Sequence, residues 1–200
     1  MKYHMENEKV FETLRDSILN LSLKPGQSLD LNALEEQFKV SRSPIRDAIN
    51  KLALANLVTI LPQRGTKVSQ INLQLADDER FIRLNLELGT LDGFLKNVTD
   101  EDFKEMEAII DKQRVAFAAR DTATVITVDI LFHKKFFTVA KRENVFHFIN
   151  NNNGNYHRLR MISFYFDNLV SGVIDEHVNL LEVAKTNNYE DLRDLDHKHI

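Results

Sequence analysis

Four residues in the second half of the chain combine side-chain types and spacings that suit a metal ion. Asp129 and His133 are four residues apart, so on a helix both side chains project from one face. His177 and His199 follow later, and a helical hairpin can return His199 beside His177. Imidazole nitrogens with one carboxylate oxygen suit Zn, Mn, Fe or Ni, whereas oxygen ligands alone would favour Mg or Ca. Four such ligands leave one or two positions of a five- or six-coordinate metal for water or an anionic ligand.

A plainer interpretation of the same residues exists, because an Asp and a His four apart on a helix are more often a surface hydrogen bond. Here the pair lies in an apolar stretch, residues 128–137, where a buried polar pair would need partners. The aromatic residues of that stretch are predicted to pack in the core. His197 competes with His199 as the last ligand, and spacing alone leaves that choice open.

A second set of residues near the amino end suits nucleic-acid recognition. Arg42 and Arg46 are four apart and share a helix face with Ser43. An arginine there can reach phosphates or the O6 and N7 edge of guanine. Ser41 is a favourable N-cap, and Pro44 fits a first helical turn. The opposite face is apolar and can pack inward: Ile45, Ala48, Ile49 and Leu52.

The elements around these arginines define how they are presented. A first amphipathic helix precedes a Pro-Gly turn, and Asp30 caps a second short helix. The apolar residues predicted to pack inward from these two helices are Val10, Leu14, Ile18, Leu21, Leu31, Leu34 and Phe38. Residues 57–61 and 66–69 predict two short strands joined by a tip with Arg64 and Gly65. This order predicts a winged helix-turn-helix in which the wing arginine contacts phosphate or the minor groove.

These residues resemble the GntR family of bacterial transcription regulators over about residues 8–71. The family's amino domain has a helix, a Pro-Gly turn, a Ser-Arg-x-Pro-Val-Arg-x-Ala-Leu helix and a Pro-x-x-Gly wing. The resemblance implies that the DNA contacts come from Arg42, Ser43 and Arg46 on the recognition helix and from Arg64 and Gly65 on the wing.

Length and charge indicate two domains, because 200 residues exceed a winged helix about threefold. We expect a DNA-binding domain over residues 1–72 and a second domain over residues 73–200. Residues 1–72 hold 10 Lys and Arg against 8 Asp and Glu, for a charge of +2, and the remainder carries −6. The lack of cysteine excludes disulfides and thiolate metal sites. No apolar run approaches a membrane span, and the start lacks a signal-peptide core, so we expect a cytoplasmic protein without a membrane partner.

The second domain is predicted to be all helix, because prolines cease after residue 72 and apolar residues recur at helical spacing. The predicted helices run near residues 76–97, 100–119, 122–141, 143–151, 155–170, 173–187 and 189–199, with Thr99 or Asp100 capping the second. The first is expected to turn Phe81, Leu84, Leu88, Leu91 and Leu95 inward. The fold is therefore mainly α: a winged helix-turn-helix followed by an antiparallel bundle of six or seven helices.

The bundle resembles the FCD-type ligand-binding domain of the FadR-like GntR branch. That domain shows Asp-x-x-Phe-His, then Glu-His, then a terminal His-Leu or His-Ile, matched here by residues 129–133, 176–177 and 199–200. The resemblance implies a metal held by Asp129, His133, His177 and His199, and it favours His199 over His197.

Three arginines are candidates for binding a ligand carboxylate. Arg83 and Glu87 match an Arg-x-x-x-Glu pair in the first helix of such domains, and the resemblance implies that this arginine faces the pocket. Arg158 and Arg160 lie two apart, and an arginine aimed inward can pair with a carboxylate. We therefore predict an effector that is a small carboxylate, bound near Arg83, Arg158 or Arg160.

Together these features predict a regulator, not an enzyme, that binds double-stranded operator DNA. A homodimer is expected because one short helix buries little DNA surface, and a dimer reads two half-sites. Two other functions explain part of the pattern. One is an architectural DNA binder with a structural metal. The other is a metal-dependent hydrolase, which lacks an obvious general base and leaves the arginines and wing unexplained.

Overall fold

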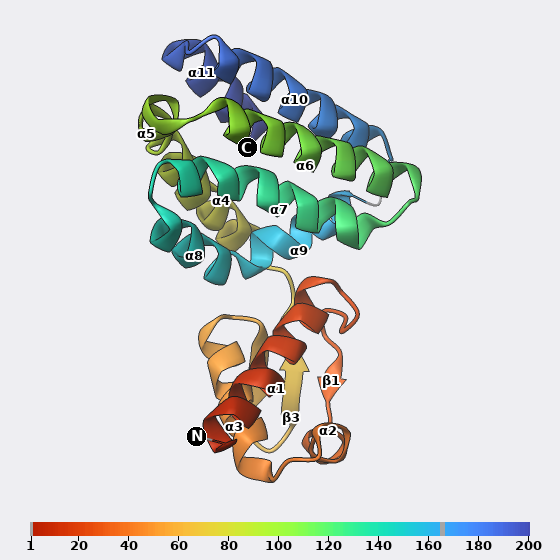
Figure 1. Cartoon of the computed structure of the whole chain (residues 1–200). Coiled ribbons are helices and arrows are strands. Elements are labelled where there is room, and N and C mark those ends of the chain that lie inside the picture. Colours follow the sequence, from red (N-terminus) through yellow and green to blue (C-terminus); the bar gives the residue numbers. More distant parts are fainter. Residues whose placement is uncertain (1, 165–166) are drawn as a thin grey trace. The chain divides into compact units, whose positions relative to one another are not determined.

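The chain is mainly α-helical in a computed structural model that describes residues 2–164 and 167–200 (Figure 1). The described residues form two compact units. The first unit comprises residues up to 76 together with 154–159, and the second comprises residues 77–153 and 160–200. In the part of the chain that the structure describes, no helix has the length and apolar character needed to cross a bilayer.

The first unit is a winged helix-turn-helix. Its helices are α1 (Lys2–Leu19), α2 (Leu31–Phe38) and α3 (Arg42–Leu54), and its strands are β1 (Ser28–Leu29), β2 (Val58–Leu61) and β3 (Gly65–Val68). The strands pair antiparallel in the order β1-β3-β2. The sequence predicted β2 and β3 but not β1, because two residues are too short to show an alternating pattern.

Local signals in the sequence explain the boundaries of these helices. Asp30 caps α2, and its side chain accepts hydrogen bonds from the backbone N–H groups of Asn32 and Ala33. Ser41 occupies the N-cap position of α3, although its hydroxyl makes no capping hydrogen bond. Leu21 was predicted to pack inward from the first helix, but it lies two residues beyond that helix, with a φ of 63°, and is only partly buried.

An apolar core holds the first unit together. Val10, Leu14, Ile18, Ile45, Ala48, Ile49 and Leu52 are all buried, as their helical spacing predicted. Fully burying one Leu, Ile or Val side chain contributes roughly 1.5–3 kcal/mol to folding. This core fixes the inner face of α3 and leaves its outer face to solvent.

The second unit is a helical bundle. The remaining helices are α4 (Leu73–Leu88), α5 (Leu91–Asn97), α6 (Asp100–Ala118), α7 (Thr122–Val139), α8 (Glu143–Asn151), α9 (Gly154–Ser163), α10 (Asp167–Lys185) and α11 (Tyr189–His199). The first residues of α4 and α9 belong to the first unit. Of the predicted helix at 155–170, residues 165–166 lie outside the described residues.

The described residues form eight helices after residue 72, because the helix predicted at 76–97 is divided into α4 and α5. The division falls at Gly89 and Thr90, where the Thr90 hydroxyl donates a hydrogen bond to the carbonyl of Glu87 over 2.7 Å. A threonine hydroxyl that competes for helical carbonyls in this way favours a helix end. Thr99 then starts α6 with a capping box that includes Asp102.

Helix α7 lies beside α6 and carries much of the bundle core (Figure 1). Phe132, Phe136 and Phe137 are almost completely buried, as predicted. The rings of Phe94 and Phe136 meet edge to face with centroids 4.8 Å apart, a favoured geometry for aromatic pairs.

Helix α4 faces the core only partly as the apolar pattern predicted, because Leu84 is buried as expected but Phe81 is not. Phe81 was expected inside, yet 64% of it is exposed. The buried side of α4 instead includes three charged residues, Glu79, Arg83 and Glu87. Charged residues are seldom fully buried unless paired, so we expect the buried charges of α4 to have partners inside the bundle.

Candidate functional site

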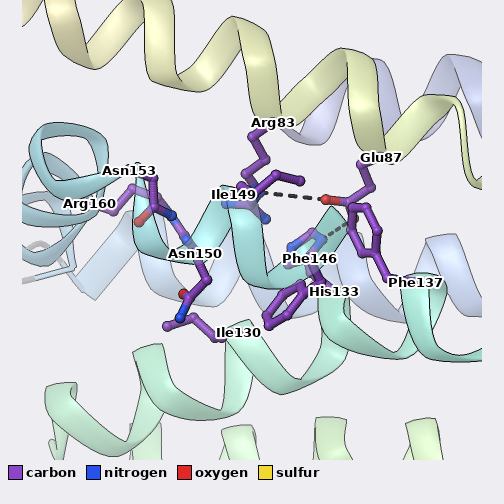
Figure 2. Close-up of a pocket in the computed structure, with 10 residues that line it drawn as sticks. All are labelled: Arg83, Glu87, Ile130, His133, Phe137, Phe146, Ile149, Asn150, Asn153 and Arg160. Carbon is purple, nitrogen blue, oxygen red and sulfur yellow. Dashed lines mark hydrogen bonds and ion pairs between the residues drawn. The ribbon is translucent and has the colours of Figure 1, made fainter. Parts of the chain in front are cut away.

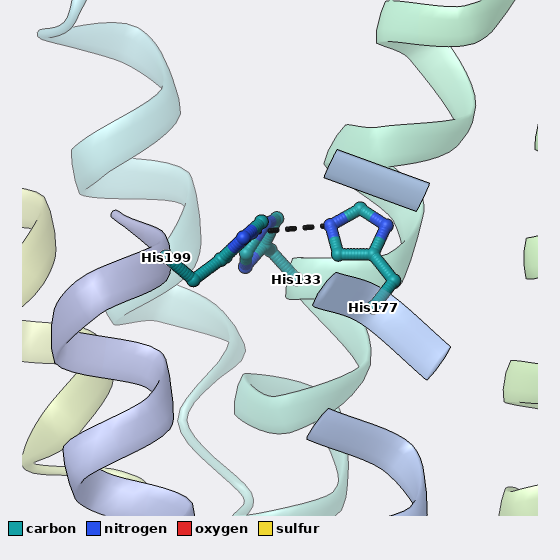
Figure 3. A group of neighbouring side chains, drawn as sticks. All are labelled: His133, His177 and His199. Carbon is teal, nitrogen blue, oxygen red and sulfur yellow. Dashed lines mark hydrogen bonds between the residues drawn. The ribbon is translucent and has the colours of Figure 1, made fainter. Parts of the chain in front are cut away.

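The four predicted metal ligands converge in the second unit. Asp129 and His133 project from α7, His177 from α10 and His199 from α11 (Figure 3 shows the three imidazoles). The Nε2 atom of His199 lies 3.1 Å from Nε2 of His133 and 3.2 Å from Nε2 of His177. Oδ1 of Asp129 lies 3.6 Å from Nε2 of His177. His197, the alternative last ligand, is exposed.

The other nitrogen of each imidazole is held by an oxygen acceptor. The pairs from Nδ1 are His177 to Oε1 of Gln113 at 2.8 Å, His199 to Oε2 of Glu176 at 2.7 Å, and His133 to Oε1 of Glu87. An acceptor at Nδ1 favours the tautomer with its proton there, which leaves the Nε2 lone pair for a metal. All three Nε2 atoms are therefore oriented as ligands.

The spacing of the donor atoms fits one ion. Two nitrogens each about 2.0–2.1 Å from the same metal lie roughly 3.0–3.4 Å apart at ordinary bond angles. The observed Nε2 separations of 3.1 and 3.2 Å fall in that range. Oδ1 of Asp129 is buried and accepts no hydrogen bond from the described residues. A cation would satisfy this oxygen.

The protonation states also suit metal binding. Burial lowers the pKa of His133 and of His177 well below the ordinary value, so both imidazoles are neutral. Burial would raise the pKa of Asp129, but the paired guanidinium of Arg160 and the other neighbouring charges together outweigh burial and hold this pKa well below its usual range. Metal ligands must be deprotonated, and these three already are at neutral pH.

Two more acidic residues lie beside the histidines. Glu87 on α4 is buried, and burial raises its pKa to about 7 despite the neighbouring Arg83. Asp196 on α11 is also buried, and burial and the charge of Glu87 raise its pKa well above the ordinary value. The sequence pattern did not identify Asp196, which is buried although the other acidic residues of α11 are exposed.

A small, partly open cavity with a free volume of about 20 Å³ adjoins the histidine cluster (Figure 2). Its polar lining includes Arg83, Glu87, His133 and Arg160, and its apolar lining includes Ile130, Phe137, Phe146 and Ile149. Asn150 and Asn153 also line it. Nε of Arg83 lies 3.5 Å from Oε2 of Glu87, and Arg160 pairs with Asp129. Two predicted effector arginines thus face one cavity.

The third predicted effector arginine, Arg158, is placed differently. Its side chain is fully buried in the first unit and does not line this cavity. Its guanidinium donates hydrogen bonds to the carbonyls of Ser69 and Gly154 and to Oδ1 of Asn155. Residues two apart on a helix point about 200° away from one another, so Arg158 and Arg160 cannot share one pocket.

The predicted DNA-contacting residues lie on the surface of the first unit. Arg42, Ser43 and Arg46 are exposed on α3, and Arg64 is exposed at the wing tip. An open groove runs between α3 and the wing, and Arg42, Arg46 and Gly65 line it. Gly65 has a φ of 87°, a conformation that favours glycine.

The groove also includes polar residues that the sequence pattern did not single out. Asn50 lies one turn beyond Arg46 on α3, and Gln63 lies in the wing turn. Both can hydrogen-bond to bases or phosphates. Spacing from Arg46 was the available signal for Asn50.

Comparisons with known proteins agree with this architecture. Residues 6–68 match the bacterial regulatory proteins of the gntR family, and residues 80–200 match the FCD domain. The HTH-type transcriptional repressor RspR of Escherichia coli is 25% identical over 179 residues, which cover 90% of this chain and 78% of that protein.

Two solved structures share the fold. The structure of E. coli McbR/YncC has a TM-score of 0.80 at 22% identity, covering 97% of this chain and 92% of that one. A putative GntR transcriptional regulator from Rhodococcus sp. RHA1 has a TM-score of 0.81 at 19% identity, covering 94% and 90%.

Proposed function

Because this chain belongs to the GntR family of bacterial regulatory proteins, in the FadR-like branch with an FCD domain, we propose that its bundle binds a metal and senses a small carboxylate. The protein is a DNA-binding transcription regulator and not an enzyme. The metal-dependent hydrolase considered from the sequence is therefore excluded.

The observation that carries the proposal is the convergence of three Nε2 atoms and one carboxylate oxygen beside a cavity. Asp129, His133, His177 and His199 would hold a divalent transition metal, Zn, Mn, Fe or Ni, with nitrogen and oxygen donors at suitable spacing. When bound, this ion supplies a positive charge and open coordination positions for an anion.

The charges around the cavity support an anionic effector. Arg160 pairs with Asp129, and Arg83 pairs with Glu87, so these four charges offset one another. A divalent ion would add positive charge to this buried site. A carboxylate ligand would offset part of that charge, and Arg83 and Arg160, which line the cavity, would donate hydrogen bonds to the carboxylate oxygens.

The cavity volume favours a small effector. Its free volume of about 20 Å³ is far below the roughly 300–1,000 Å³ that ligand pockets occupy, so an effector bound there has to be compact. The apolar wall suits a short carbon skeleton, and the two asparagines suit a polar substituent. The effector class is therefore a compact carboxylic acid.

DNA recognition would use the outer face of α3 and the wing. Arg42, Ser43 and Arg46 are exposed on one face, and Arg64 and Gly65 extend from the wing tip. One such helix buries little DNA surface, so we infer a homodimer that reads two half-sites.

The dimer contact would lie in the bundle. Phe81 and Ile82 are neighbours on α4 and are 64% and 43% exposed. Effector binding would change DNA affinity only to the extent that the effector prefers one arrangement of the dimer.

A metal analysis tests the first half of the proposal. We expect about one transition metal per chain in purified wild-type protein and in His197→Ala, which alters an exposed histidine next to the site. His133→Ala and His177→Ala should lose it. Wild-type protein that contains no metal and takes up none on titration would overturn the site.

A carboxylic-acid screen tests the second half. An acid at 100 times its dissociation constant stabilises the folded protein by about 2.7 kcal/mol, and this shift should vanish in the metal-free protein. The acid should also change affinity for an operator fragment selected from random DNA. If no small acid changes melting temperature or DNA affinity, the protein is an architectural DNA binder with a structural metal.

A further inference from the structure

Three carboxylate oxygens near the histidine cluster are buried without a hydrogen bond from the described residues. They are Oε2 of Glu87 and both oxygens of Asp196. Both residues are completely inaccessible to solvent. A buried ionised carboxylate without a hydrogen-bond donor is unfavourable, so this pair is suited to a bound partner.

The two carboxylates are close enough to share one ion. An oxygen of Glu87, an oxygen of Asp196 and a ring nitrogen of His133 all lie within 4.8 Å of one another. Donor atoms bound to one cation at about 2.1–2.4 Å can be separated by up to about 4.8 Å. The two carboxylates therefore meet the distance requirement for sharing a cation.

Glu87 can serve the histidine cluster and this second site at once. Its Oε1 atom is engaged by Nδ1 of His133, while its Oε2 atom has only the 3.5 Å ion pair with Arg83. Asp196 precedes His199 by three residues on α11, so one helix supplies a ligand to each site.

The charge count also favours a cation. Glu87 and Asp196 carry two negative charges when ionised, and Arg83 offsets one of them. The negative charge of Asp196 then remains without an ion pair to the described residues. A divalent cation would compensate it and add positive potential next to the effector cavity.

We propose that Glu87 and Asp196 bind a second divalent cation beside the three-histidine centre. Two carboxylates make this a harder, more oxygen-rich site than its neighbour, and the preferred ion is Mn²⁺ or Mg²⁺. The protein donors of this second site are the carboxylates of Glu87 and Asp196 alone, because both ring nitrogens of His133 are engaged at the histidine centre.

The test is the number of Mn²⁺ ions bound per chain, measured by elemental analysis after loading with MnCl₂ and removal of free metal. We expect two ions in wild-type protein and one in Asp196→Asn, which keeps the shape of the side chain. Asp194→Asn changes an exposed acid of the same helix and should keep two. His177→Ala should keep one, and His177→Ala with Asp196→Asn should keep none.

Each result decides between the sites. A single ion that is unchanged by Asp196→Asn and lost in His177→Ala supports the histidine centre and overturns the second site, leaving a shared proton between the two acids. Two ions in both wild type and Asp196→Asn also overturn it. Circular dichroism and melting temperature confirm that each variant is folded.

Discussion

Replacing Gln113 with leucine should weaken metal binding without touching a metal ligand. Gln113 is completely buried, and its Oε1 atom lies 2.8 Å from Nδ1 of His177. When Nε2 of His177 binds a metal, the ring proton must sit on Nδ1. Leucine cannot accept a hydrogen bond from this N–H group, so the metal-bound state loses a buried hydrogen bond. In the metal-free state the proton can move to Nε2, so the penalty there is smaller.

The expected effect follows from this difference between the two states. Loss of a partner that orients a metal-binding histidine typically lowers metal affinity 10- to 100-fold, or about 1.4–2.7 kcal/mol. That range agrees with the roughly 1–3 kcal/mol cost of a buried polar group left without its partner. We therefore expect Gln113→Leu to raise the dissociation constant by one to two orders of magnitude.

Competition with a chromophoric Zn²⁺ chelator at pH 7.5 measures this change. Lys112→Leu places the same side chain at the adjacent, exposed position of α6 and should bind Zn²⁺ like the wild type. A Gln113→Leu dissociation constant within twofold of wild type, in a protein that remains folded, would refute the argued role of this glutamine.

Other substitutions test the DNA-reading helix, a buried histidine and the aromatic core. Arg46→Ala should weaken binding to a selected operator in a gel-shift titration, by about 1–3 kcal/mol if Arg46 contacts a base. If Arg46 contacts a phosphate, the salt dependence of the binding constant should fall by about one phosphate contact. Lys141→Ala should change neither quantity. In metal-free protein, the lowered pKa of His177 means that the unfolded chain binds a proton that the folded chain does not, so stability is lost as the pH falls below about 6.5. His177→Gln should therefore reduce the pH dependence of the unfolding free energy between pH 6.5 and 5, by up to about 1.4 kcal/mol per pH unit in urea titrations. Phe136→Ala should cost about 3–5 kcal/mol of stability in the same assay, and a loss below 1 kcal/mol would contradict its central place in the core.

The elements with strong periodic signals were predictable from the sequence. The apolar face of α3, from Ile45 to Leu52, is buried as its spacing indicated. The short strand β1 and the end of α1 before Leu21 were not predictable, because tertiary pairing and a left-handed residue decide them. Helix α4 was misread at Phe81 for a related reason: a periodicity rule assigns apolar residues to the core, and here buried charges occupy that side.

Much of the candidate site was also accessible from spacing and family resemblance. Asp129 and His133 share a helix face, and the resemblance selected His199 over His197, which is exposed. The partners that orient the rings were harder to predict. Gln113 lies 64 residues before His177, and only the packing of α6 against α10 brings the two together. A single glutamine in an amphipathic helix carries no signal of that role.

The buried polar side chains of the bundle form a connected system. Arg160 pairs with Asp129, and Glu87 joins Arg83 to His133. Each of these groups loses its hydrogen bonds to water on folding, and only its protein partners replace them. The network therefore stabilises the fold only when every partner is present. A metal ion bound by Asp129 and the three imidazoles would add a partner on one side, and a carboxylate in the cavity would add one on the other. These buried polar groups are unfavourable to folding when the ligands are absent, so ligand binding would change the stability of the bundle packing. A regulator that responds to a ligand requires this property.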